Sequence, residues 1–154
     1  MKELKIIPYE QQYQLAYKKL SLEWLEKFDL FEEADRPMIE NPKATILNKG
    51  GFIFLAKYEG AIVGTIALKK VNNNSFELLK LGVNTNYQGL GIGKKLVIHC
   101  IDFCKTKQAE KIILETNSKL ESAIALYKKL GFQEVILTNV NYELSDYKME
   151  LKLN

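Results

Sequence analysis

The sequence predicts an α+β (α/β) fold, with helices on the faces of a mixed central sheet. About six or seven segments have the pattern of strands and four have the spacing of helices, in the order β α α β β β α β α β β. Two of the strands are joined by Glu59-Gly60, the strongest short hairpin signal in the chain. The 154 residues, 47% hydrophobic and 27% charged, are expected to form a single domain over 1–154.

The first third is expected to hold one strand and two helices. Residues 4–7 form a short extended run. Apolar residues then recur at helical spacing over 11–28. A shorter helix is expected over 37–47, with Asp35 as a cap and Pro42 as a break.

Three strands are expected next, over 51–58, 61–71 and 76–83. The polar run 72–75 is a turn between the last two. Gly82 is the expected site of a β-bulge. Alternation along the third strand places Glu77, Leu79 and Leu81 on one face and Phe76, Leu78 and Lys80 on the other.

The rest of the chain alternates helices and strands. A glycine-rich stretch, 88–93, precedes a helix over 92–107. The remaining elements are a strand at 111–115, a helix at 120–130 that ends at Gly131, and strands at 133–137 and 147–153.

Composition excludes several classes of function. Of 22 basic residues only Arg36 is arginine, so we expect no nucleic-acid partner. No apolar run approaches the length of a membrane span, and the charged start does not resemble a leader peptide, so no membrane association and a cytoplasmic location are expected. The net charge of +3 is compatible with an anionic cofactor.

A metal site is not expected. Cys100 and Cys104 share a helix face next to His99, but one His and no CxxC pair cannot supply the four ligands of a zinc site. The two cysteines are therefore expected to be small buried hydrophobes.

The glycine-rich stretch is an anion-binding arrangement. It follows a strand and leads into the first turn of a helix, whose free N–H groups and dipole favour the binding of phosphate. A Walker A loop fails at Gln88 and Lys95, and a dinucleotide fingerprint fails at Lys94 or Leu96. The pattern that fits is [QR]xxGx[GA], with Gln88, Gly91 and Gly93.

With this pattern the chain resembles the GNAT superfamily of Gcn5-related N-acetyltransferases. FELLKLGVNTNYQGLGIGKKL, ILETNSKLESAIALYKKLGF and YKMELKL resemble its successive elements over nearly the whole chain. The resemblance implies a mostly antiparallel sheet, acetyl-CoA as co-substrate, no metal, and acetyl transfer to a primary amine of a small molecule or peptide in a ternary complex. It also implies a cofactor site made by Leu81, Gly82, Val83, Gln88, Gly89, Leu90, Gly91, Ile92, Gly93, Lys94 and Asn117.

The resemblance also suggests catalytic residues. Tyr127 is expected to protonate the departing thiolate, although its place on an apolar stripe is also typical of a core residue. Glu77 is the candidate base, or else an exposed strand residue. The N–H group of Val83, beside the expected bulge, is the candidate oxyanion donor.

Other assignments stay open at this level. Leu120 stands where the family often has a cofactor-binding asparagine, so the polar contact to the cofactor is uncertain, and Asn117 is the nearby candidate. A non-catalytic acyl-CoA sensor of the same fold is the alternative function, and a homodimer is open. The acceptor site is expected to draw on Tyr17, Trp24, Phe28, Arg36 and Tyr142.

Overall fold

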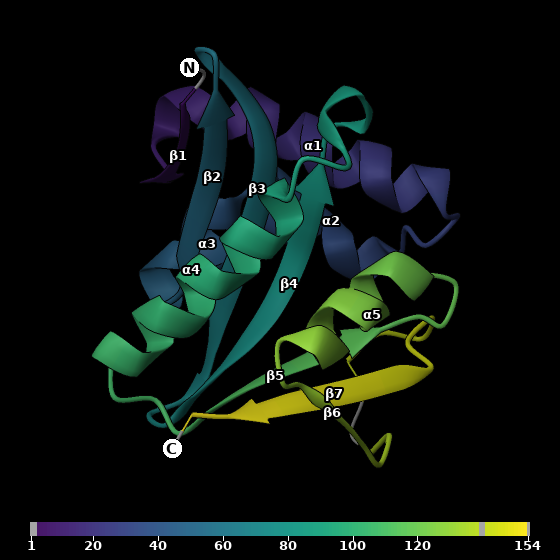
Figure 1. Cartoon of the computed structure of the whole chain (residues 1–154). Helices are drawn as coiled ribbons and strands as arrows, with labels where there is room; N and C mark the ends of the chain where they lie inside the picture. Colours follow the sequence, from purple (N-terminus) through teal and green to yellow (C-terminus); the bar gives the residue numbers. More distant parts are fainter. Residues whose placement is uncertain (1–2, 139–140, 154) are drawn as a thin grey trace.

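The computed structural model describes residues 3–138 and 141–153 and has a seven-stranded sheet in the order β1-β2-β3-β4-β5-β7-β6 (Figure 1). The strands are β1 Leu4–Pro8, β2 Phe52–Tyr58, β3 Ala61–Asn72, β4 Ser75–Val83, β5 Lys111–Thr116, β6 Gln133–Val135 and β7 Tyr147–Lys152. The helices are α1 Gln14–Lys27, α2 Arg36–Glu40, α3 Pro42–Thr45, α4 Ile92–Thr106 and α5 Glu121–Lys129. The predicted fold class is confirmed, and the element order agrees except that one predicted helix is divided in two.

Helices cover the sheet on both faces. The largest core lies under α4 and α5, where Leu96, Cys100 and Ile124 pack against strand residues such as Ile66 and Leu68. Figure 1 shows α4 and α5 on the near face, with α1, α2 and α3 behind the sheet. The side chains of Cys100 and Cys104 are buried in the core, as expected.

Most predicted boundaries are shifted by one to three residues, and two elements differ in a way that has a physical cause. The helix expected over 37–47 is divided at Asn41: the Asn41 side chain accepts the N–H of Ala44, and Pro42 begins α3, where its missing N–H costs nothing. The strand expected over 133–137 ends at Val135, and Ile136 is 82% exposed. The apolar residues after Val135 therefore made the predicted strand two residues too long.

The β-bulge in β4 lies at Lys80 and not at Gly82 as predicted. Lys80 has φ +57°, and the register with β3 passes from Thr65 opposite Gly82 to Ala67 opposite Leu79. Because of the extra residue, the side chains that follow point to the opposite face of the sheet from the one that simple alternation predicts. Lys80 therefore lies on the α1 face, whereas Leu81 and Val83 pack into the core under α4 and α5. Val83 pairs in register with Gly64, so the bulge gives no reason to assign Val83 as oxyanion donor.

The contact between β4 and β5 is short. These parallel strands pair only from Ser75 opposite Lys111 to Glu77 opposite Ile113. Figure 1 shows them diverging from that point toward the right of the view. The divergence opens the middle of the sheet between α1 and α5.

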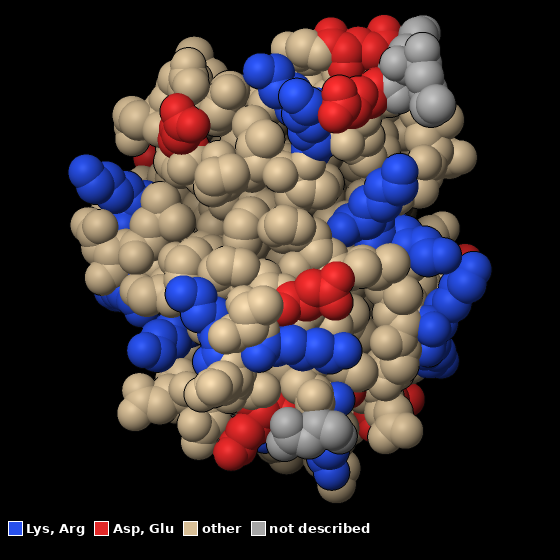
Figure 2. Space-filling model, turned by 60° about the vertical axis from the view of Figure 1, so that its left-hand side comes forward, with Lys and Arg blue, Asp and Glu red and all other residues tan. Residues whose placement is uncertain are grey.

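The surface carries mixed charge. Figure 2 shows basic and acidic side chains interspersed over one face. In the described part of the chain, none of the helices has the length and apolar character needed to cross a membrane. Location, dimerisation and the absence of a nucleic-acid partner stay predictions.

Candidate active site

Two hollows meet where β4 and β5 separate. The first, called the groove below, has a volume of about 570 Å³ and runs past the glycine-rich stretch and the start of α5. The second, called the inner pocket, is a cavity of about 90 Å³ between β4, β5 and the segment after α1. Trp24, Leu81 and Leu120 line both, so the two hollows adjoin at these side chains.

The groove is built around the start of α4. Gly89 and Gly91 have φ +80° and +78°, a left-handed conformation that other residues adopt only with strain, and nothing lies within 4 Å of where a Cβ would stand on either. Gly91 is the N-cap, so the first N–H groups of the helix are free to bind an anion. Gln88 supports the turn by donating from Nε2 to the carbonyl oxygen of Val83, at 3.3 Å.

Charged side chains around the groove favour a polyanion. Lys27, Lys94 and Lys119 line it together with one carboxylate, that of Glu121. The predicted cofactor residues that line the groove are Leu81, Gly82, Val83, Gln88, Gly89, Gly91, Ile92, Gly93 and Lys94.

Two predicted cofactor residues are placed elsewhere. Leu90 is 56% exposed and is not part of the groove lining. Asn117 lines the inner pocket, where its Nδ2 donates to the carbonyl oxygen of Leu144 at 2.7 Å and its Oδ1 accepts the N–H of Lys119. The structure therefore does not bring Asn117 to the groove.

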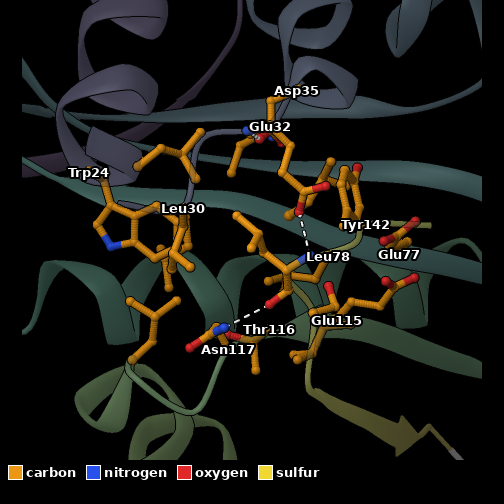
Figure 3. A pocket seen from close by; sticks show the side chains of 18 of the residues that line it. Trp24, Leu30, Glu32, Asp35, Glu77, Leu78, Glu115, Thr116, Asn117 and Tyr142 are labelled. Atoms are coloured by element: carbon orange, nitrogen blue, oxygen red, sulfur yellow. Dashed lines mark hydrogen bonds and ion pairs between the residues drawn. The ribbon is translucent and has the colours of Figure 1, made fainter. Parts of the chain in front are cut away.

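Glu77 points into the inner pocket (Figure 3) and is 3% exposed. No described residue donates a hydrogen bond to its carboxylate. Burial raises the pKa of Glu77, and the nearby carboxylate of Glu115 raises it further, while Lys69, Lys80 and Lys148 oppose the shift. This position excludes the alternative of an exposed strand residue and suits a group that takes up a proton.

Tyr127 also lines the inner pocket, from α5. Its ring packs against Phe132 with the centroids 5.6 Å apart, and the side chain is 6% exposed. Burial raises the pKa of the Tyr127 phenol, and the neighbouring Cys100 adds to the shift. Tyr127 is thus both a core residue and a residue of the inner pocket lining that carries a protonated hydroxyl.

Sequence reasoning missed the buried ion pair between Lys80 and Asp35. The two side chains are only 5% and 6% exposed. Asp35 also accepts the N–H of Glu32 at 2.9 Å, which holds it in the turn after α1. The Lys80 Nζ lies 5.7 Å from the centroid of the Tyr142 ring. Burial lowers the pKa of Lys80, and Asp35 partly offsets this effect.

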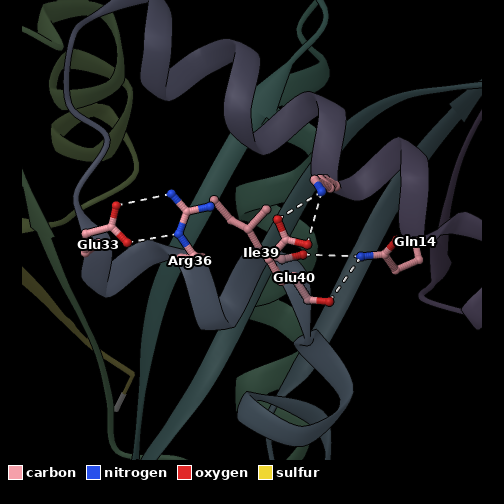
Figure 4. A network of polar contacts seen from close by, with 6 residues as sticks. Gln14, Glu33, Arg36, Ile39 and Glu40 are labelled. Carbon is pink, nitrogen blue, oxygen red and sulfur yellow. Dashed lines mark hydrogen bonds and ion pairs between the residues drawn. The ribbon is translucent and has the colours of Figure 1, made fainter.

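Only some of the predicted acceptor residues line the groove or the inner pocket. Trp24 lines both hollows, Phe28 lines the groove and Tyr142 lines the inner pocket. Tyr17 is fully buried and donates from its hydroxyl to the carbonyl oxygen of Met38 at 2.9 Å. Arg36 instead forms a forked pair with Glu33 on the surface, as Figure 4 shows. Neither Tyr17 nor Arg36 lines a hollow.

Comparisons with known proteins agree with this architecture. An acetyltransferase from Staphylococcus aureus Mu50, described as of the GNAT family, superimposes with a TM-score of 0.89 at 30% identity, over 99% of this chain and 100% of that one. A putative acetyltransferase from Salmonella typhimurium, solved with its cofactor acetyl-CoA, gives a TM-score of 0.76 at 16% identity, over 99% and 95% of the two chains. At that identity the second likeness shows the fold alone.

Sequence relatives cover a smaller region. The N-alpha-acetyltransferase RimI of Mycobacterium tuberculosis is 31% identical over 93 residues, which are 58% of this chain and 57% of that protein. The chain spans about half the length of the curated relatives it matches. The sequence model of the acetyltransferase (GNAT) family matches residues 17–132. Since this match spans most of the chain and includes the groove and the catalytic candidates, the protein belongs to the GNAT acetyltransferase family.

Proposed function

We propose that this protein transfers an acetyl group from acetyl-CoA to a primary amine by direct attack in a ternary complex. The observation that carries the proposal is that the two hollows adjoin and share lining residues. A groove suited to a polyanion lies next to a pocket that holds a buried carboxylate, Glu77, and a buried phenol, Tyr127. The acetyltransferase names of the relatives support the same activity.

The groove would hold the coenzyme. The N–H groups of 89–94 would bind its pyrophosphate, and Lys27, Lys94 and Lys119 would add positive charge. The pantetheine arm would then follow the backbone of 81–83, where β4 has left β5. This places the thioester near the junction of the two hollows.

Glu77 and Tyr127 would move the two protons of the reaction. Glu77 accepts a proton from the bound ammonium, and the free amine attacks the thioester carbonyl carbon. When the C–S bond breaks, the sulfur leaves as a thiolate and takes the proton of the Tyr127 hydroxyl. The nitrogen, which still carries one proton too many after the attack, loses it to solvent, and solvent returns a proton to Tyr127. The raised pKa of Glu77 suits a base that takes a proton from an ammonium.

Calorimetric titration with acetyl-CoA tests the binding site. Gly91→Glu should abolish micromolar binding, because the carboxylate would stand where the phosphate binds and φ +78° disfavours any side chain. Gly60→Glu is the matched control: Gly60 has φ +82°, equally open surroundings, and lies outside the groove. Equal binding by wild type and Gly91→Glu would refute the proposed phosphate site.

A turnover assay distinguishes the proposed enzyme from the alternative, a non-catalytic acyl-CoA sensor. Release of free thiol from acetyl-CoA should depend on an added amine and should fall in Glu77→Gln. Tight binding without turnover on any amine would instead favour an acyl-CoA sensor.

A further inference from the structure

Residues 141–146, called the strap below, join the two walls of the inner pocket. One wall is the segment after α1, which carries Glu32 and Asp35. The opposite wall is the turn from β5 to α5, which carries Asn117 and Ser118. The strap contributes Tyr142, Leu144 and Ser145 to the pocket lining.

Hydrogen bonds fasten the strap to the first wall through one carboxylate. Glu32 accepts the N–H of Glu143 with one oxygen and the N–H of Leu144 with the other, each at 2.8 Å. Hydrogen bonds to an ionised group are stronger than those between neutral groups. The middle of the strap is therefore held firmly against the segment after α1.

The second wall holds the same part of the strap from the other side. Asn117 donates to the carbonyl oxygen of Leu144, so Leu144 is bonded to both walls. In Figure 3 the dashed lines of these two bonds start at Glu32 and at Asn117. Asp146 accepts the N–H and the hydroxyl of Ser118, both at 2.8 Å. Together these contacts make the strap a bridge across the outer side of the pocket, from one wall to the other.

The space behind the strap is small. Tyr142 turns inward from the strap beside Lys80, and its hydroxyl lies 3.7 Å from the Met38 sulfur. The cavity that remains is about 90 Å³. For comparison, an apolar cavity of about 150 Å³ admits benzene. The free space suits a ligand of a few heavy atoms, placed between the Glu77 carboxylate and the apolar side chains of Trp24 and Leu30.

We propose that the acceptor is a small-molecule amine and not the N-terminus of a polypeptide, an inference that rests on the function proposed above. An amine at Glu77 occupies the inner end of the pocket. The second residue of a peptide acceptor would have to leave through the outer side, which the strap crosses. A peptide must therefore break the hydrogen bonds of Glu32 and Asn117 to bind, whereas a small amine leaves them intact.

Two conjugates of coenzyme A test this without requiring turnover. In each, an acetyl spacer joins the sulfur to an amine: ethylamine in one and the N-terminus of a tetrapeptide in the other. Calorimetry on the full chain should show the peptide conjugate binding more weakly by on the order of a hundredfold, because the strap must be released. Glu32→Gln, which loosens the strap, should reduce this ratio at least tenfold.

Glu33→Gln is the matched control, because it removes the same charge one residue away from an exposed pair with Arg36. It should leave the ratio unchanged. Asn117→Ala, which removes the other support of Leu144, should reduce the ratio as Glu32→Gln does. Equal or tighter binding of the peptide conjugate by the wild type would overturn the inference and leave the proposed function standing. If acetyl-CoA itself does not bind, the proposed function and the inference both fall.

Discussion

Neutralising Asp35 tests the buried ion pair at the wall of the pocket. In Asp35→Asn the amide oxygen can still accept the N–H of Glu32, but the Lys80 ammonium loses its counter-charge. With both side chains at most 6% exposed, bulk water compensates little for the lost partner. Removing one member of a buried pair costs about 3–5 kcal/mol. Lys80 could instead lose its proton, which from an ordinary lysine pKa costs about 4–5 kcal/mol at neutral pH. Both routes predict that the free energy of unfolding falls by about 3–5 kcal/mol.

The loss has a definite pH dependence. If Lys80 is neutral in the folded variant, the unfolded state binds one more proton than the folded state. Stability then rises with pH until the unfolded lysine also titrates. Relative to wild type, Asp35→Asn should recover about 1.4 kcal/mol per pH unit above neutrality.

Urea unfolding followed by circular dichroism, at pH 7 and pH 9, measures both effects. Glu33→Gln makes a similar charge change in an exposed pair and should leave the midpoint unchanged. A loss below about 1 kcal/mol, the range of surface pairs, would refute the argument from burial. A loss that does not shrink at pH 9 would refute the argument that Lys80 loses its proton.

Three further predictions concern catalysis and packing. Tyr127→Phe should lower kcat, measured by thiol release, by about a hundredfold. It should change the Kd of acetyl-CoA, measured by calorimetry, by less than about twofold. An unchanged kcat would show that the hydroxyl takes no part in the reaction. The activity of the wild type should fall on acidification at a pH above the ordinary glutamate pKa of 4.5, because burial raises the pKa of Glu77. Glu77→Gln should abolish this loss of activity at acidic pH. A loss that persists in the variant would show that another group titrates. Gly51→Ala should cost about 1–3 kcal/mol or more, because its Cβ would lie 2.5 Å from the carbonyl oxygen of Leu68. Gly93→Ala, whose Cβ would come no closer than 3.8 Å to a neighbour, should cost less, and equal urea midpoints would contradict this.

The sequence patterns predicted the elements because each depends on local periodicity. The hairpin at Glu59-Gly60 and the glycine turn before α4 are both determined by neighbouring residues. The bulge at Lys80 could not be found in this way, because no glycine marks it. Its side chain faces a partner, Asp35, that lies 45 positions earlier in the chain.

The same limit applies to the site. The groove was predicted in large part because one continuous segment, 88–94, supplies much of it. The walls of the inner pocket come from segments far apart in sequence, such as Glu32 and Leu144. Spacing along the chain carries no information about such contacts, so the role of the strap became apparent only from the folded structure.

The short pairing of β4 with β5 has a consequence for dynamics. Because the ladder ends at Glu77, the two halves of the sheet share few backbone hydrogen bonds, and local opening between them should require little free energy. An extended ligand bound along 81–83 would supply partners for amides that β5 does not reach. Its binding should therefore slow hydrogen exchange of these amides and make the two halves of the sheet unfold as one cooperative unit.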